Sequence, residues 1–263
     1  MRRKKQTPRQ SQARNYKLFS FLHQPSIFSC ITSSNPATLT SCPPHPYAPV
    51  FEDSQRNHRG RLLIHPPKNL TIATTGASGS LFLKHLLLAV AADERVQTVN
   101  FIASDSGLRV MAEELGISGR SNLVAQITGQ ASPKIHQQAN SDIAANVASG
   151  SYPADAMVVL PCSMGTLARI ANGIASQLIE RAADVCLKEK RQLVLCARET
   201  PLSKIHIRNM YRAADAGATI FPLIPAFYYQ PATLDAIASE FAYRVLAHIG
   251  LPQAAAFQWK KDT

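Results

Sequence analysis

A cation and a carboxylate, Arg198 and Glu199, stand side by side directly after the apolar run at residues 193–197. The run has the length and composition of a buried strand, and Pro201 favours a turn after it. Ligands of α/β proteins bind where such strands end, so the pair offers a charge for an anionic ligand and a base for proton transfer. The alternative is a loop ion pair in which Glu199 only orients Arg198.

Two other predicted strand ends carry glycine and hydroxyl residues. Residues 76–80 (GASGS) lie between a strand and a helix, where backbone N–H groups favour an anion, although Gly and Ser also suit a plain turn. The segment has neither the G-x-G-x-x-G spacing nor a Walker lysine, which disfavours NAD and ATP. Residues 163–166 (SMGT) form a second such turn. Two hydroxyl-bearing turns at one sheet edge suit FMN, whose phosphate, ribityl hydroxyls and ring need several donors.

Short apolar runs alternate with helical stretches from residue 69 onward, which predicts one α/β domain with a parallel, Rossmann-like sheet and helices on both faces. Strands are expected at residues 70–74, 96–103, 155–160, 193–197 and 218–221. Helices are expected at residues 81–92, 167–183, 205–216 and 234–249, and another follows residues 104–107 and runs through residue 115. Residues 116–152 show no clear period.

The net charge of +11 is unevenly distributed over the 263 residues. Residues 1–68 hold eleven Lys or Arg against Glu52 and Asp53, so they carry nine of the eleven net charges. The basic pI therefore describes an extension, and we do not expect the folded body to bind nucleic acid.

Residues 1–66 are rich in Ser, Pro, Gln and Arg and are predicted to be a disordered basic extension, either an organellar transit peptide or the result of a mis-assigned start. Residues 67–254 form the predicted domain, and residues 255–263 a short tail. No apolar stretch is long enough for a membrane span. A cytoplasmic protein is expected, or a mitochondrial one if the extension is a transit peptide.

Five cysteines form no C-x-x-C pair, which argues against structural zinc and a disulfide framework. Cys162 lies beside the second turn, but no obvious base is near it in sequence. We interpret it as a small buried residue.

Several long segments together closely resemble the UbiX-type flavin prenyltransferases. They are residues 161–168 (PCSMGTLA), 179–189 (IERAADVCLKE), 198–203 (RETPLS) and 225–228 (PAFY), and the resemblance runs from residue 69 to about residue 252. It implies a flavoprotein-like three-layer fold that transfers a dimethylallyl group from dimethylallyl phosphate to N5 and C6 of reduced FMN. The product, prenylated FMN, would serve a UbiD-type decarboxylase, in ubiquinone biosynthesis or another pathway. A homo-oligomer, a dodecamer by resemblance, with active sites at subunit contacts is also implied.

The resemblance assigns roles to matching positions. Those expected to bind FMN are Gly76, Ala77, Ser78, Ser104, Ser163, Met164, Gly165, Thr166 and Arg198. Those expected to hold the prenyl phosphate are Arg181, Lys188, Tyr228 and Arg244. Catalytic roles are expected for Glu199, Ser78, Lys188 and Glu114.

The residue types suit this reaction, because fixed cations stabilise the charge that develops on a departing phosphate. No D-D-x-x-D cluster is present, so metal-independent activity is predicted. Glu199 is the candidate base for the C6 proton, in competition with phosphate itself, and Ser78 for positioning the proton at N5. Some relatives carry an aromatic residue where this chain has Ile143, which leaves prenyl chain length and rate open.

Two alternatives remain. One is an FMN-dependent decarboxylase of the same fold, for which His136 is the only histidine in the middle of the body. The other is a non-catalytic FMN carrier, which would not need Lys188, Glu199, Tyr228 and Arg244.

Overall fold

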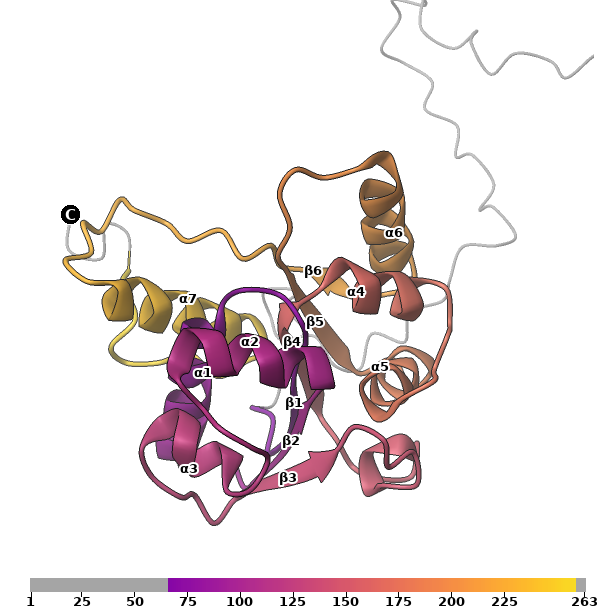
Figure 1. The fold of residues 1–263 in the computed structure, drawn as a ribbon, viewed down its shortest axis with the longest axis horizontal. Coiled ribbons are helices and arrows are strands. Elements are labelled where there is room, and N and C mark those ends of the chain that lie inside the picture. Colours follow the sequence, from indigo (N-terminus) through magenta and orange to yellow (C-terminus); the bar gives the residue numbers. More distant parts are fainter. Residues whose placement is uncertain (1–65, 259–263) are drawn as a thin grey trace, which may run out of the picture. The chain divides into compact units, whose positions relative to one another are not determined.

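The computed structural model describes residues 66–258, and these form a six-stranded parallel sheet between two layers of helices (Figure 1). The strand order is β3-β2-β1-β4-β5-β6. The strands are β1 (Asn69–Thr74), β2 (Thr98–Ala103), β3 (Ile135–Ala139), β4 (Ala156–Cys162), β5 (Gln192–Ala197) and β6 (Thr219–Ile220). The predictions for the basic extension and for the last five residues of the tail concern residues outside the described range.

Helices cover both faces of the sheet. One layer contains α1 (Ser80–Ala92), α2 (Asp105–Leu115), α3 (Leu123–Thr128) and α7 (Leu234–His248). The other contains α4 (Met164–Ala171), α5 (Leu178–Lys188) and α6 (Lys204–Asp215), and a single 3₁₀ turn, η1 (Asn146–Ala148), packs beside α5. None of the helices in residues 66–258 is long and apolar enough to cross a bilayer.

Alternate residues of the central strands enter two separate cores. In β4, Val158 belongs to the core under α1 and α7, whereas Met157 and Val159 belong to the core under α4 and α5. A strand covered on both faces buries every side chain, as β4 does, and therefore reads as a continuous apolar run. This is why the central strands were recognisable in the sequence.

The predicted fold class is confirmed, but three predictions about elements were wrong. Residues 66–258 contain six strands rather than five, because β3 is an edge strand whose polar residues 136–138 give no apolar run. The single helix expected at residues 167–183 is two helices, α4 and α5, separated at Gly173, whose φ of +67° does not continue a helix. Strand β4 continues two residues beyond its expected end at residue 160.

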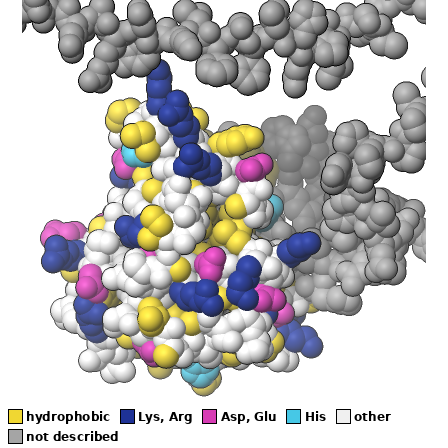
Figure 2. All heavy atoms as spheres, turned by 90° about the vertical axis from the view of Figure 1, so that its right-hand side faces the viewer, with side chains coloured by type: hydrophobic (Ala, Val, Ile, Leu, Met, Phe, Trp, Pro, Cys, Tyr) yellow, Lys and Arg dark blue, Asp and Glu magenta, His cyan; other side chains and the backbone are white. Residues whose placement is uncertain are grey.

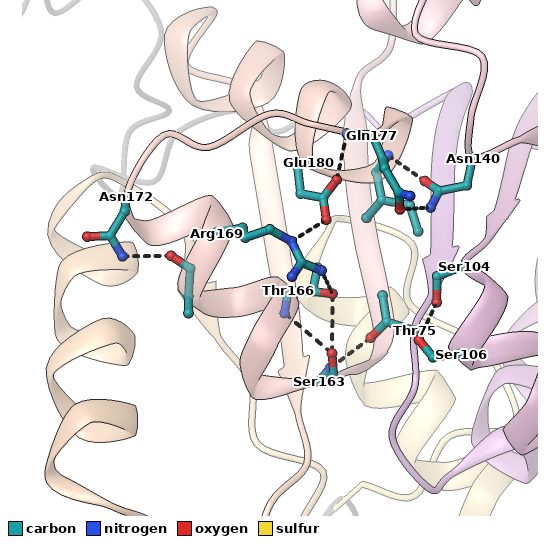
Figure 3. A network of polar contacts seen from close by, with 12 residues as sticks. Thr75, Ser104, Ser106, Asn140, Ser163, Thr166, Arg169, Asn172, Gln177 and Glu180 are labelled. Carbon is teal, nitrogen blue, oxygen red and sulfur yellow. Dashed lines mark hydrogen bonds and ion pairs between the residues drawn. The ribbon is translucent and has the colours of Figure 1, made fainter.

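The strand order reverses between β1 and β4, which is the point where α/β sheets open a crevice for ligands. The loops after these two strands are joined by hydrogen bonds. Thr75 donates its backbone N–H to the Pro161 carbonyl at 3.1 Å, and its Oγ1 accepts from the Ser163 N–H at 2.7 Å (Figure 3). The two glycine and hydroxyl turns found in the sequence therefore lie side by side.

The side of the molecule that carries α5 and α6 has a mixed surface. Figure 2 shows Lys and Arg side chains on it interspersed with acidic and hydrophobic ones. On this face, the described residues present no broad field of a single sign, which agrees with the expectation that the basic charge resides mainly in the extension.

Candidate active site

The first turn, between β1 and α1, is shaped by two glycines. A Cβ on Gly76 would lie 2.5 Å from the Cβ of Ser106, so the missing side chain gives room to the start of α2. Gly79 has a φ of +134°, which L side chains rarely adopt. From the sequence, these glycines were expected to let a ligand approach the backbone of the turn. In the structure, Gly76 allows the turn to pack against α2, and a Cβ on Gly79 would lie 2.8 Å from the Leu223 side chain.

Glu114 on α2 caps the beginning of α1. Its carboxylate accepts the backbone N–H groups of Gly79 at 3.0 Å and Ser80 at 2.7 Å, and Ser78 donates its hydroxyl to it. Burial acts to raise the pKa of Glu114, but the hydrogen bonds from Ser78, Ser80 and Gly79 outweigh it and lower the pKa below its usual value. Glu114 is therefore ionised at neutral pH, and it fills the anion-favouring end of α1.

The second turn opens α4. Ser163 is the N-cap, and its Oγ accepts the Thr166 N–H at 3.4 Å. The Met164 side chain is buried in the core, so only its backbone faces this edge of the sheet, while Thr166 is buried with its hydroxyl 3.2 Å from that of Ser163. Ser104 caps α2 in the same way, accepting the Gly107 N–H at 3.0 Å.

A cavity of about 320 Å³ lies between the beginnings of α2 and α4. Four hydroxyl side chains line it: Ser104, Ser106, Ser163 and Thr166. Of the predicted FMN-binding residues, the structure thus brings Ser104, Ser163 and Thr166 to one cavity. Gly76 of the first turn lies next to its wall, since a Cβ at this position would lie 2.5 Å from the Cβ of Ser106.

The polar network behind this cavity was not predicted from the sequence. Arg169 donates its Nε to Glu180 at 2.7 Å, and Glu180 also accepts the backbone N–H of Gln177 at 3.0 Å (Figure 3). Asn140, which follows β3, accepts the Ile179 N–H at 3.0 Å and donates to the Gln177 side chain. The Gln177-x-x-Glu180 spacing is that of a capping box and was the available signal.

Arg198 and Glu199 lie at the carboxyl end of β5, as predicted, and both are exposed. Among the described residues they form no ion pair with each other, because Glu199 instead accepts the backbone N–H of Thr200 at 3.2 Å. The backbone N–H of Arg198 binds the Cys162 carbonyl at 3.1 Å, which holds this segment against the second turn. The ion-pair alternative for Glu199 therefore finds no support.

Two of the predicted phosphate-binding residues lie on α5, away from the cavity. Arg181 binds Asp184 at 2.7 Å and the Ala148 carbonyl at 3.1 Å. Lys188 pairs with Glu189 at the last turn of the helix, just before β5 begins. Helix α5 runs back toward the start of β5. Lys188 therefore lies near the amino ends of the strands, whereas Ser163 lies at their carboxyl ends.

The other two lie on the far side of the sheet. Arg244 is exposed on α7, and Tyr228 lies in the segment that leads to this helix, with its ring 5.5 Å from that of Phe257. Helices α5 and α7 cover opposite faces, so a single chain does not bring Lys188 and Arg244 together.

Three further residues behave as follows. Burial raises the pKa of the Cys162 thiol to about 12, which fits a buried packing residue and not a nucleophile. His136 is exposed on the edge strand β3 and does not line the cavity. Ile143 is exposed in the loop after β3. No group of three or more potential metal-ligating side chains gathers within residues 66–258.

The comparisons with known proteins match most of the part of the chain that the structure describes. The model of the Flavoprotein family matches residues 64–238. The flavin prenyltransferase UbiX of Pseudomonas aeruginosa is 39% identical over 199 residues, which are 73% of this chain and 94% of that protein.

Two solved structures are similar over nearly their whole length. The structure of AnUbiX (PadA1) in complex with FMN and dimethylallyl pyrophosphate is 37% identical, with a TM-score of 0.65, over 73% of this chain and 97% of that one. A dodecameric FMN-dependent UbiX-like decarboxylase from Escherichia coli O157:H7 is 38% identical, with a TM-score of 0.65, over 73% of this chain and 98% of that one.

Proposed function

Because the chain belongs to the flavoprotein family and to its UbiX-type flavin prenyltransferases, we propose that it transfers a dimethylallyl group from dimethylallyl phosphate to N5 and C6 of reduced FMN. The observation that carries the proposal is the match to nearly the whole of a flavin prenyltransferase, together with a similar structure that holds FMN and a dimethylallyl donor. The cavity at the switch point supports it, because its four hydroxyls suit a phosphorylated flavin.

Reduced FMN is the acceptor substrate and supplies the two positions, N5 and C6, at which the new bonds form. The hydroxyls of Ser104, Ser163 and Thr166 and the backbone N–H groups of Gly76, Ser78, Met164 and Gly165 are proposed to bind its phosphate and ribityl chain. The guanidinium of Arg198, held at the end of β5 beside the second turn, is proposed to contact the flavin from the other side of the crevice.

Proton transfer is assigned to the two carboxylates of the site. Glu199 is exposed and not paired with Arg198, so its carboxylate is available to remove the C6 proton. Glu114 holds the Ser78 hydroxyl by a hydrogen bond, which positions Ser78 for the proton at N5.

The donor phosphate is proposed to bind Arg181, Lys188, Tyr228 and Arg244. Cations stabilise the extra negative charge of phosphate as the allylic C–O bond breaks. Since α5 and α7 lie on opposite faces of the sheet, we propose that one donor site takes these residues from more than one copy of the chain.

Exposed apolar side chains support an oligomer. Helix α6 leaves Ile205, Ile207 and Tyr211 between 54% and 70% exposed. A surface of this kind is typical of subunit contacts, and the similar Escherichia coli protein is dodecameric. We propose a homo-oligomer of the same size, and a UbiD-type decarboxylase as the recipient of the product.

The decarboxylase alternative is weaker. It requires a catalytic histidine, and His136 lies exposed on an edge strand outside the cavity. An FMN carrier would have no use for the donor-binding set.

The test is an anaerobic incubation of the purified protein with reduced FMN and dimethylallyl phosphate, with and without EDTA, followed by mass spectrometry of the released flavin. A gain of one dimethylallyl unit in both samples is expected. Unmodified flavin with every prenyl phosphate and pyrophosphate tried would overturn the proposed activity, and a product only without EDTA would overturn metal independence.

A further inference from the structure

We propose that Arg169, fixed by the buried carboxylate of Glu180, binds the phosphate group of FMN and makes the site selective for FMN over riboflavin. This inference rests on the proposed function and adds two residues to it. Neither residue belongs to the set taken from the family resemblance.

Glu180 is built to hold a cation in one place. It is only 3% exposed, and both carboxylate oxygens are occupied, one by Arg169 Nε at 2.7 Å and the other by the Gln177 N–H at 3.0 Å. Asn140 in turn fixes the beginning of α5 through Ile179. The guanidinium therefore has little freedom, and it loses little entropy when it binds a ligand.

The remaining donors of Arg169 lie at the cavity. Both Arg169 and Glu180 line it together with Ser163 and Thr166 (Figure 3). Within residues 66–258, the guanidinium makes only one further hydrogen bond, a long one of 3.4 Å from Nη2 to Thr166 Oγ1. Arginine presents five N–H donors, so several are available for an oxyanion.

The charges around the cavity favour an anion between α2 and α4. Arg169 and Arg109 line it, and the two acidic residues that also line it are paired, Glu180 with Arg169 and Asp105 with Arg120. The neighbouring beginning of α1 is already occupied by the Glu114 carboxylate. Of the helices that begin at this cavity, α5 has the N–H groups of Gln177 and Ile179 bonded to Glu180 and Asn140, so α2 and α4 are the two whose beginnings favour a ligand phosphate.

A purely structural role is the competing explanation, because a buried glutamate needs a counter-ion. The two roles differ in what they predict for a flavin without phosphate. A phosphate contact affects FMN alone, whereas a structural defect affects FMN and riboflavin together.

The experiment measures the affinities of oxidised FMN and riboflavin by fluorescence titration. The test variant is R169Q/E180Q, which removes the cation without leaving a buried charge, and the control is E180Q, which retains Arg169. We expect R169Q/E180Q to bind FMN roughly ten- to hundredfold more weakly than E180Q does, with riboflavin affinity unchanged.

Equal losses for both flavins, or no loss for FMN, would overturn the inference. Circular dichroism checks folding, and R169M/E180Q replaces the test variant if the glutamine at position 169 is not tolerated. A wild-type protein that bound neither flavin would instead refute the proposed function and this inference with it. A variant that binds riboflavin normally but FMN weakly would show that the protein has a flavin site and that Arg169 contacts the phosphate there.

Discussion

Single residues at the switch point combine a proposed role in the reaction with a structural role. Glu114 was expected near the reacting groups, and it also closes the first turn of α1 through Gly79 and Ser80. Gly76 was expected to admit a ligand, and it also admits Ser106. Groups that bind a ligand must themselves be held in place, so the residues that hold them lie directly beside them.

The Glu114 cap predicts a pH dependence of stability. Its pKa is lowered in the folded protein, so its contribution is present above the usual value of 4.5 and is lost as pH falls through the folded pKa. We expect Glu114→Gln to lower stability by about 1 kcal/mol or less at pH 7, since the residue is exposed.

Thermal unfolding of the wild type and E114Q between pH 7 and pH 3 measures this effect. The difference in Tm is expected to shrink below pH 4.5. A difference that grows on acidification would contradict the assigned direction of the shift.

The assignment of Glu199 as base predicts a kinetic effect. Glu199→Gln preserves the shape but removes the proton acceptor, so we expect kcat for prenylated FMN to fall about 100-fold or more with FMN affinity nearly unchanged. Single-turnover assays with mass detection, alongside FMN titration, separate the two quantities. Full turnover in E199Q would assign the proton to another group, such as the released phosphate.

At the scale of elements, the cavity depends on β3, which lies in the part of the sequence that shows no clear period. Strand β3 is polar and lies at the sheet edge, yet Asn140 at its end holds the beginning of α5. Helix α5 then places Glu180 against Arg169 on α4. A segment without apolar periodicity thus determines how two helices meet at the cavity.

Asn140 is expected to matter for stability. It is 5% exposed, and Asn140→Ala leaves the Ile179 N–H without its partner in a buried place. Such a loss costs about 1–3 kcal/mol. Urea unfolding measures it, with Gln97→Ala as the control because Gln97 is an exposed amide whose side chain bonds none of the described residues. Equal stability of N140A and Q97A would show that the bond is dispensable.

At the scale of the whole molecule, the sheet separates the predicted donor-binding residues. Lys188 and Arg244 belong to opposite helical layers, and the turns predicted to bind FMN lie at the carboxyl ends of the central strands. The sequence places all of them in one chain, but the fold distributes them over different surfaces. A shared site therefore requires contacts between copies.

Complementation tests this arrangement. Lys188→Met and Arg244→Met are each expected to be inactive, and co-expression is expected to restore about a quarter of wild-type activity because mixed oligomers contain intact sites. The control is mixing of the two separately purified oligomers. No recovery in verified mixed oligomers would place both residues in the site from a single copy.

Removal of residues 1–63 is expected to leave activity unchanged. The family match begins at residue 64, and the sheet begins at Asn69. Prenylated FMN formation by the truncated and full-length proteins is the comparison to make. A truncated protein that folds but has lost activity would give the extension a role in catalysis.

The sequence alone determined the fold class, the central strands and the turns that carry the site. These depend on local signals, because a doubly covered strand is apolar throughout and a tight turn needs Gly or a hydroxyl. The tertiary structure alone revealed β3, the break between α4 and α5, and the Arg169–Glu180 pair. These depend on pairing between residues distant in the chain, since an edge strand is defined by its neighbour and a buried ion pair by the two elements that meet there.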